Sequence, residues 1–285
     1  MNKKKPRVWF ITGASSGLGY EFTRKALELG DKVVGVARNT EKLNEFTHQY
    51  GESFLSLKLD VTDRDSVFKV VEEAITHFGR LDIVINNAGN MIMGMIEEFS
   101  EEEIRRQVDT NFYGAVWVTQ AVMPQLRSQA SGHIIQISSI GGLITGPMTG
   151  IYSASKFALE GFSESLAQEA VHFGVKVSIV EPGGYWTNLY LKMGQTIPKG
   201  EYNSLREELA KQNFESNDSD PKLAAEALIE LVNSKNPPLR LILGSAVFDA
   251  AIESTKKRIA TWEEWESVSR SAENNIPAPE GYGES

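Results

Sequence analysis

Short apolar runs alternate along the chain with longer stretches in which apolar residues recur at helical spacing. The first run, Val8-Trp9-Phe10-Ile11, precedes an amphipathic stretch that begins at Gly17. Runs that are apolar throughout are typical of strands buried on both faces, and the longer stretches are typical of helices that pack on one side. The pattern therefore predicts an α/β fold with a mostly parallel sheet covered on both faces. Strands are expected at 7–11, 32–37, 53–59, 82–86, 132–138, 175–180 and 239–243, and helices at 17–29, 41–50, 63–78, 101–127, 152–173 and 246–265.

Three segments interrupt this alternation. Residues 183–204 are long for a connection and contain glycine and aromatic residues, and 214–221 are polar and rich in turn-forming residues. Residues 276–285 are dominated by Pro, Gly and Glu. We expect one domain over 1–275, with a substrate loop at about 183–220, and a disordered tail at 276–285.

Composition narrows the classes of function. The 285 residues include no cysteine, which excludes disulfides, thiolate metal sites and a thiol nucleophile. Lys and Arg number 29 against 38 Asp and Glu, and the net charge of −9 argues against nucleic-acid or membrane-surface binding. The apolar run at 8–11 is too short for a secretory leader, and no run approaches a membrane span. We expect a cytoplasmic protein with a small-molecule partner and no metal.

A glycine-rich turn, Thr12–Gly19, connects the first expected strand to the first expected helix. Gly13 suits the sharp turn, Gly17 the close approach of a ligand, and Gly19 the packing of helix on strand. The amino end of a helix offers free N–H groups and a favourable dipole, which suit a pyrophosphate. The spacing is G-x-x-x-G-x-G instead of G-x-G-x-x-G, and an ordinary loop is the alternative interpretation. The position after the first strand favours a dinucleotide site.

The end of the second strand predicts which dinucleotide is bound. It reads Ala37-Arg38-Asn39-Thr40, with no acid to bind a ribose 2′-hydroxyl, and Asp31 lies at the opposite end of that strand. The guanidinium of Arg38 suits a 2′-phosphate by its charge and its several donors. A solvated surface arginine is the alternative. We expect NADP as the cofactor, with NAD still open.

Tyr152 and Lys156 stand four residues apart on an expected helix, and therefore on one face of it. A phenol has an ordinary pKa of about 10, and a neighbouring ammonium lowers that pKa toward the range useful for proton transfer. An exposed pair on a helix surface is the alternative. The context favours chemistry, because Ser139 follows the preceding strand at the sheet edge where α/β proteins place ligands.

The expected helix at 101–127 contains Asn111, a residue type that helix interiors disfavour. We therefore expect two helical pieces that break near Phe112. A kink or a buried, hydrogen-bonded amide is one interpretation of Asn111, and a place in the ligand site is the other.

In their order and spacing, these motifs resemble the short-chain dehydrogenase/reductases, in the compact single-domain branch of that family. The resemblance implies a three-layer doubly wound Rossmann fold with a mostly parallel seven-stranded sheet, and it implies NAD(P) as cofactor. It covers about residues 7–190 and rests on Thr12–Gly19, Asp60, Asn86–Gly89, Asn111, Ser139, Tyr152, Lys156, Pro182, Gly183 and Thr187.

The resemblance also implies a role for each matching residue. Tyr152 is the implied general acid/base, and Lys156 lowers its pKa and binds the ribose. Ser139 orients the substrate oxygen, and Asn111 holds a water of a proton relay. Family members that prefer NADP have arginine where Arg38 stands, and often a basic residue where this chain has serine. The implied cofactor contacts are Gly13, Ser15, Ser16, Gly17, Leu18, Gly19, Arg38, Asp60, Val61, Asn87, Ala88, Gly89, Tyr152, Lys156, Pro182, Gly183 and Thr187.

Three segments are expected to surround the nicotinamide, namely 90–94, 143–148 and 185–193. They are apolar, aromatic and rich in methionine. Such a lining suits an apolar carbonyl or alcohol, such as a steroid, a retinoid, or a fatty or aromatic ketone. Closure of the core is the alternative role.

The predicted function is an NADP-dependent oxidoreductase that interconverts a ketone or aldehyde with an alcohol by hydride transfer. A non-catalytic NADP-binding sensor or scaffold is the alternative, but a pure binder has no need of the Tyr152 phenol. An epimerase or dehydratase on an extended version of the fold would need a larger carboxyl-terminal domain. Trp262 and Trp265 are candidates to anchor the last expected helix to the body or to a second subunit of a homodimer or homotetramer.

Overall fold

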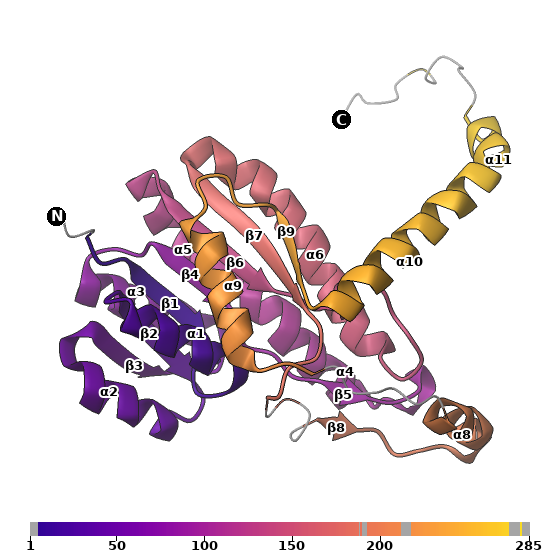
Figure 1. The fold of residues 1–285 in the computed structure, drawn as a ribbon, viewed down its shortest axis with the longest axis horizontal. Helices are drawn as coiled ribbons and strands as arrows, with labels where there is room; N and C mark the ends of the chain where they lie inside the picture. The colour runs from indigo at the N-terminus through magenta and orange to yellow at the C-terminus, as the bar shows by residue number, and fades with distance from the viewer. Residues whose placement is uncertain (1–4, 188, 190–192, 212–217, 274–279, 281–285) are drawn as a thin grey trace.

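The computed structural model describes residues 5–187, 189, 193–211, 218–273 and 280. A seven-stranded sheet runs through its centre, and every pair of neighbouring strands is parallel (Figure 1). The predicted fold class is confirmed, and each predicted strand forms within two residues of its predicted ends. In sheet order the strands are β3 (Phe54–Lys58), β2 (Lys32–Ala37), β1 (Val8–Thr12), β4 (Ile83–Asn86), β6 (Gly132–Ile137), β7 (Val175–Pro182) and β9 (Arg240–Leu243).

Alternate residues of each strand supply the two faces of the core. In β1, Trp9 and Ile11 belong to one hydrophobic cluster, and Val8 and Phe10 belong to the other. All four side chains are buried, as the unbroken apolar run predicts. The first cluster is covered by α1 (Gly17–Glu28), α2 (Asn44–Tyr50) and α9 (Pro221–Asn233), and the second by α3 (Arg64–Phe78), α5 (Gly114–Gln129) and α6 (Gly150–Ala170).

The predicted break in the 101–127 helix is confirmed. A π-helical turn, Asp109–Tyr113, separates α4 (Glu101–Val108) from α5. Such turns widen the backbone by one residue and occur often at functional sites. The turn brings Asn111 into the interior, where it is 2% exposed.

The 183–220 region contains more regular structure than the sequence predicted. It includes α8 (Asn203–Lys211) and the short strand β8 (Gly194–Gln195), which pairs with β5 (Ile92–Met93). The helix α9, which the sequence analysis missed, begins where the polar 214–221 segment ends. Asp220 caps it by accepting a hydrogen bond from the N–H of Lys222, and Pro221 lies in its first turn. These two signals are present in the sequence, so α9 was predictable.

The predicted helix at 246–265 forms as α10 (Ser245–Glu264), and α11 (Glu266–Ser271) follows it. Together they project away from the rest of the structure (Figure 1). Every residue from 255 to 273 is exposed. The tail predicted at 276–285 lies outside the described residues, apart from Glu280. Within the described part of the chain, no helix is long and apolar enough to cross a membrane.

Candidate active site

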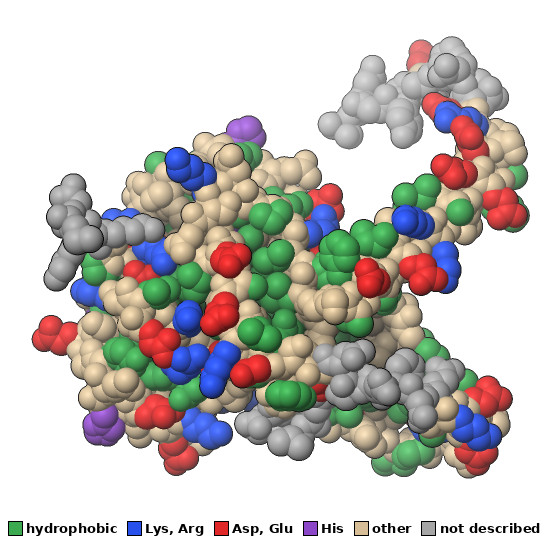
Figure 2. Space-filling view, in the orientation of Figure 1, with side chains coloured by type: hydrophobic (Ala, Val, Ile, Leu, Met, Phe, Trp, Pro, Cys, Tyr) green, Lys and Arg blue, Asp and Glu red, His purple; other side chains and the backbone are tan. Residues whose placement is uncertain are grey.

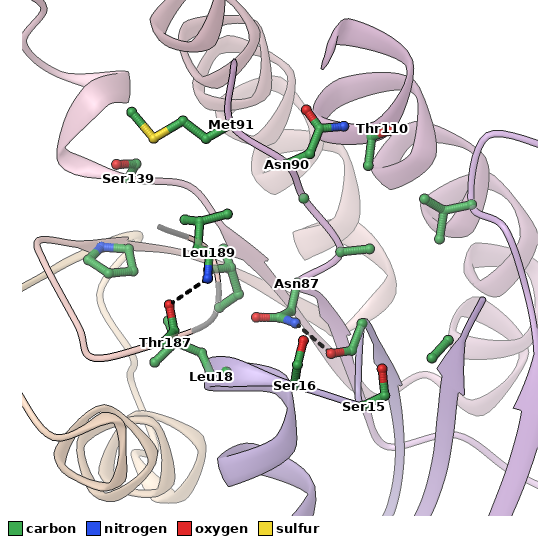
Figure 3. Close-up of a pocket in the computed structure, with 18 of the residues that line it drawn as sticks. Ser15, Ser16, Leu18, Asn87, Asn90, Met91, Thr110, Ser139, Thr187 and Leu189 are labelled. Atoms are coloured by element: carbon green, nitrogen blue, oxygen red, sulfur yellow. Dashed lines mark hydrogen bonds between the residues drawn. The ribbon is translucent and has the colours of Figure 1, made fainter. Parts of the chain in front are cut away.

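A cavity of about 400 Å³ opens where β1, β2, β4, β6 and β7 end (Figure 3). Its walls come from segments that are far apart in sequence, because parallel strands bring their carboxyl ends to one edge of the sheet. All the predicted cofactor contacts line it except Gly19. They are Gly13, Ser15, Ser16, Gly17, Leu18, Arg38, Asp60, Val61, Asn87, Ala88, Gly89, Tyr152, Lys156, Pro182, Gly183 and Thr187.

The glycine-rich turn adopts a backbone that glycine permits. Gly13 and Gly17 have φ values of +66° and +57°, in the left-handed region that side chains disfavour. Gly19 is needed for space, because a Cβ there would lie 2.4 Å from the carbonyl oxygen of Gly13. The helix α1 thus packs against the turn, and Ser16 at its amino end makes no side-chain cap hydrogen bond. The first N–H groups of α1 therefore suit an anion in the cavity.

Thr12 and Asn87 fasten this turn to the end of β4. The hydroxyl of Thr12 accepts hydrogen bonds from the N–H groups of Asn87 and Ala88, both at 2.9 Å. In return, Nδ2 of Asn87 donates to the carbonyl oxygen of Thr12 at 2.9 Å and reaches that of Gly13 at 3.4 Å (Figure 3). This network fixes the distance between the two walls of the cavity.

Arg38 and Asp60 lie at the end of the cavity formed by β2 and β3. Oδ1 of Asp60 accepts hydrogen bonds from the N–H of Thr62 at 3.0 Å and from its hydroxyl at 2.8 Å. Arg38 is exposed and lines the cavity, and it makes no ion pair within the described part of the chain. Its guanidinium is thus available to an anionic group of a ligand.

Tyr152 and Lys156 lie one turn apart on α6, and both are buried, at 9% and 6% exposure. They are therefore not an exposed surface pair. Nζ of Lys156 donates to the carbonyl oxygen of Ile137 at 2.9 Å and lies 5.8 Å from the centre of the Tyr152 ring. Burial lowers the pKa of Lys156 to about 8, and the charge of Glu160 opposes this effect. The ammonium is placed where it would stabilise a phenolate.

Asn111 lies behind the cavity wall and does not line it. Its Oδ1 accepts from the N–H of Asn90 at 2.8 Å, and its Nδ2 donates to the carbonyl oxygen of Asn90 at 2.9 Å and to Ser155 Oγ at 3.1 Å. This is the buried, hydrogen-bonded amide that the sequence offered as one interpretation. A Cβ at Gly89 would lie 3.3 Å from Oδ1 of Asn111 and 3.9 Å from Nζ of Lys156, so Asn111 and Lys156 are close neighbours.

Ser139 begins the 3₁₀ turn Ile140–Gly142 that follows β6. Its hydroxyl accepts a hydrogen bond from the N–H of Gly141 at 3.1 Å. A Cβ at Gly141 would lie 3.1 Å from Cε1 of Tyr152, so this turn rests on the phenol ring. The sequence motif thus places Ser139 and Tyr152 on the same part of the cavity wall.

A second cavity of about 350 Å³ adjoins the first and shares Met91, Ser139, Tyr152, Gly183 and Leu189 with it. Each of the three predicted substrate segments reaches it in part, through Met91, through 144–146 and through Leu189. Other residues of these segments do not line the second cavity. Ile92 is buried in β5, and Trp186 is 68% exposed. The sequence analysis missed Ile140, Thr149 and Ser153, which also line this cavity. Thr149 is the N-cap residue of α6 and Ser153 follows Tyr152 on that helix, so their nearness to Tyr152 in sequence was the available signal.

Comparison with known proteins agrees with this geometry. A family model described as short chain dehydrogenase matches residues 7–197. The chain is 37% identical over 270 residues to oxidoreductase BOA17 of Botryotinia fuckeliana. The aligned part covers 92% of this chain and 98% of that protein. It is 39% identical over 250 residues to the 3-ketodihydrosphingosine reductase of Bacteroides thetaiotaomicron, with 85% and 90% covered.

Solved structures show the same relationship. A short-chain dehydrogenase from Streptomyces avermitilis matches with a TM-score of 0.88 at 36% identity, covering 95% of this chain and 100% of that one. A closed serine dehydrogenase complexed with NADP⁺ matches with a TM-score of 0.71 at 26% identity, covering 83% and 94%.

The chain belongs to the short-chain dehydrogenase family. It is thus an oxidoreductase of the class that uses a nicotinamide dinucleotide, and the family and enzyme class predicted from the sequence are confirmed.

Proposed function

We propose that the protein catalyses the NADP-dependent interconversion of an apolar ketone or aldehyde with its alcohol. One observation carries this proposal. Tyr152 and Ser139 line both the larger cavity and the smaller cavity beside it, so the Tyr152 phenol lies where the two meet. Lys156 is buried next to that phenol. A non-catalytic sensor remains the alternative and is separated by the experiment below.

The residues of the larger cavity fit NADP. The turn of Gly13 and Gly17 at the amino end of α1 suits the pyrophosphate. The guanidinium of Arg38, which forms no ion pair with any described residue, suits the 2′-phosphate. Asp60 and Val61 would contact the adenine, and Pro182, Gly183 and Thr187 would hold the nicotinamide. The NADP⁺ in the serine dehydrogenase structure supports this choice over NAD.

The proposed chemistry uses the side chains at the junction. NADPH held by the residues of the larger cavity would supply the hydride that the carbonyl carbon accepts. Tyr152 donates its phenolic proton to the carbonyl oxygen, and the hydroxyl of Ser139 holds that oxygen in place. The ammonium of Lys156 stabilises the phenolate until it is reprotonated, with Asn111 beside the relay water. Alcohol oxidation is the reverse sequence.

The smaller cavity supports an apolar substrate. Met91, Ile140, Ile144 and Leu189 contribute apolar side chains, and the described residues of this lining include no Lys, Arg, Asp or Glu. A carboxylate or phosphate substrate would therefore find no charged partner among these described residues. A ketone or alcohol of the fatty, steroid, retinoid or aromatic type fits this chemistry, and one relative is named 3-ketodihydrosphingosine reductase.

The experiment measures the absorbance of NADPH at 340 nm with a panel of apolar ketones and aldehydes. Wild-type protein is expected to consume NADPH with at least one of them, and Tyr152→Phe is expected to bind NADPH without consuming it. Tyr113→Phe is the matched control, because Tyr113 is 42% exposed and lines neither cavity. Tight NADPH binding with no turnover of any carbonyl or alcohol would favour the sensor instead.

We also propose one nucleotide-binding domain over 1–275, in which the 183–220 region serves as the substrate loop. Gly183, Tyr185, Thr187 and Leu189 of this region line the larger cavity, which supports the assignment.

We further propose that copies of the chain pair through α10, as a homodimer or as the dimers of a homotetramer. Phe248, Ile252, Ile259 and Trp262 lie on one face of α10 at spacings of four, seven and three, and each is at least 42% exposed. Figure 2 shows hydrophobic side chains exposed among charged ones along this projecting helix. Helices in proteins gain most of their stability from packing an apolar face, which α10 lacks beyond residue 255.

The charges beside this stripe favour a second copy as the partner. Lys256 and Glu263 flank the same side of the stripe and form no ion pair with any described residue. In an antiparallel pair of α10 helices that crosses near Ile259, Lys256 of one copy lies level with Glu263 of the other. A second copy therefore covers the apolar side chains and also pairs both charges.

A further inference from the structure

Three charged side chains from different elements meet beneath Lys156, outside both cavities. Glu160 is on α6, Glu181 on β7 and Arg240 on β9. Nε of Arg240 lies 3.1 Å from Oε2 of Glu160 and 3.5 Å from Oε1 of Glu181. Glu160 is 5% exposed and Glu181 is completely buried. Two buried carboxyl groups thus share one guanidinium, and the mechanism above uses none of the three.

The guanidinium neutralises only one of these carboxylates. A second buried negative charge without a partner is costly, so one carboxyl group keeps its proton. Glu160 makes the hydrogen bond to Nε of Arg240, whereas neither carboxyl oxygen of Glu181 has a hydrogen-bond partner among the described residues. Burial, reinforced by the charge of Glu160, raises the pKa of Glu181 to about 8. Burial also raises the pKa of Glu160, but the charge and hydrogen bond of Arg240 and the charge of Lys156 oppose that rise. The geometry therefore assigns the negative charge to Glu160 and the proton to Glu181.

The charge of Glu160 acts on Lys156. The two residues are four apart on α6, so they share a face of the helix. Burial alone favours loss of the proton from Lys156, and the negative charge of Glu160 opposes that loss. Among the described residues, the other charged groups that pair with Arg240 are Glu181 from β7 and Glu164 from α6. The last is exposed and accepts from Nη2 of Arg240 at 3.1 Å.

We propose that Glu160 is a positioning residue for catalysis, and that the pair of Glu160 and Glu181 keeps Lys156 charged as the pH rises. The inference rests on the proposed function, since that function assigns Lys156 its role. When Glu181 releases its proton in alkaline solution, a second negative charge appears in the cluster that Glu160 connects to Lys156. The ammonium then holds its own proton to a higher pH, because coupled groups titrate as a set. The pair would widen the alkaline range in which Lys156 can bind ribose and stabilise a phenolate.

The test compares Glu160→Gln, Glu181→Gln and Glu164→Gln. Glu164→Gln is the matched control, because Glu164 touches the same guanidinium from the surface. NADPH affinity is measured by its fluorescence from about pH 6 to 10, which spans the ordinary titration of a buried lysine. In Glu160→Gln the alkaline loss of affinity is expected about one pH unit earlier, which is a tenfold change in proton affinity. Glu181→Gln is expected to shift in the same direction, and Glu164→Gln is expected to follow the wild type.

Glu181→Gln guards against a variant that fails to fold. An amide is close in shape and charge to the protonated carboxyl group of Glu181, so this variant is expected to match the wild type at pH 7 and to differ only in alkaline solution. Coincident profiles for wild type and Glu181→Gln, or an equal shift in Glu164→Gln, would overturn the inference. The readout needs no turnover, so failure of the proposed reaction would be seen separately, as NADPH binding without consumption.

Discussion

Glu98 and Arg206 form an ion pair of 2.5 Å that joins α8 to the segment between β5 and α4. The side chain of Glu98 is fully buried, and it also accepts hydrogen bonds from the hydroxyl of Thr196 at 3.0 Å and the N–H of Lys199 at 2.8 Å. The hydrogen bond from Arg206 is the main cause that lowers the pKa of Glu98 to about 2. The later part of the 183–220 region, which carries Thr196, Lys199 and Arg206, is thus fixed to the body of the protein. The first part, which carries Gly183 and Leu189, lines the cavities.

Glu98→Gln is expected to weaken substrate binding while leaving cofactor binding intact. The neutral amide loses the ion pair with Arg206, so the region that carries Leu189 becomes less well positioned over the second cavity. We expect KM for the carbonyl substrate to rise about tenfold, the effect of losing one charge-assisted hydrogen bond, with little change in the NADPH dissociation constant. Glu97→Gln is the matched control. Glu97 is the neighbouring acid, but it is exposed, and its carboxylate lies 3.7 Å from Nζ of Lys199 in a surface ion pair. Equal KM values for the two variants would show that Glu98 does not position this region.

Arg38→Asp is expected to lower NADPH affinity roughly ten- to hundredfold, the value of a charge-assisted hydrogen bond to a phosphate. Affinity for NADH is expected to change little or to improve, because the new carboxylate suits a ribose hydroxyl. Lys58→Asp makes the same change of charge at the end of β3, outside the cavity. Fluorescence titration with both dinucleotides measures the effect. A wild-type protein that binds NADH more tightly than NADPH would contradict the assignment of NADP.

The central strands β1, β2, β4, β6 and β7 were predictable from the sequence because they are buried on both faces, so that hydrophobicity alone marks them. The edge strands β3 and β9 are only partly buried, and their short apolar runs were the signal. The glycine turn and the Tyr152–Lys156 pair were predictable for a related reason, since both follow strand ends that converge at one edge of the sheet. The helix α9 was not predicted although Asp220 and Pro221 mark its start, because it follows the polar 214–221 segment directly and its apolar spacing begins only after that segment.

The charged groups beneath the site were not predictable in the same way. Glu160, Glu181 and Arg240 come from three elements, and nothing in the local sequence shows that β7 and β9 bring two of them against α6. Likewise Glu98 is ordinary in sequence, and only the fold reveals that it binds residues about a hundred positions away. Contacts of this kind depend on the register and order of the strands.

His133 is expected to make the protein less stable in mild acid. It lies on β6 at 3% exposure, its Nε2 is 3.0 Å from Ser178 Oγ, and burial lowers its pKa from 6.5 to about 4. Between pH 6.5 and about pH 4, the unfolded chain therefore binds more protons than the folded chain. The free energy of unfolding falls as the pH drops through this range. The loss from this residue reaches on the order of 3 kcal/mol.

Urea unfolding at pH 7.5 and pH 5 measures the part of this loss that falls above pH 5, about 2 kcal/mol. His133→Gln is expected to reduce the difference between the two conditions, whereas His48→Gln, at an exposed position, is expected to leave it unchanged. An unaltered difference in His133→Gln would mean that another group sets the acid stability.

Substitutions at the junction of the two cavities are expected to separate binding from turnover. Tyr152→Phe removes the proton donor and is expected to lower kcat by several orders of magnitude. A typical general acid contributes roughly 10²–10⁴-fold to the rate. The affinity for NADPH is expected to be retained. Lys156→Met is expected to impair both, and Ser139→Ala to lower kcat with little effect on NADPH affinity. Stopped-flow single turnovers measure the rate of the reaction, and fluorescence titrations measure the affinity for NADPH. Near-normal turnover in Tyr152→Phe would show that the proton comes from elsewhere.

The exposed apolar residues on α10 predict a dimer that pairs through this helix. The chain has no cysteine, so a single introduced cysteine tests the pairing directly. Ile259 lies at the expected crossing of two α10 helices, so Ile259→Cys is expected to form covalent dimers on mild oxidation. Lys257→Cys, on the opposite face of the helix, is the control and is expected to remain uncoupled. Trp262→Asp would bury a charge in the interface and is expected to give monomers by light scattering, with NADPH affinity unchanged. A monomeric wild type, or equal coupling at both cysteine positions, would rule out pairing through this face.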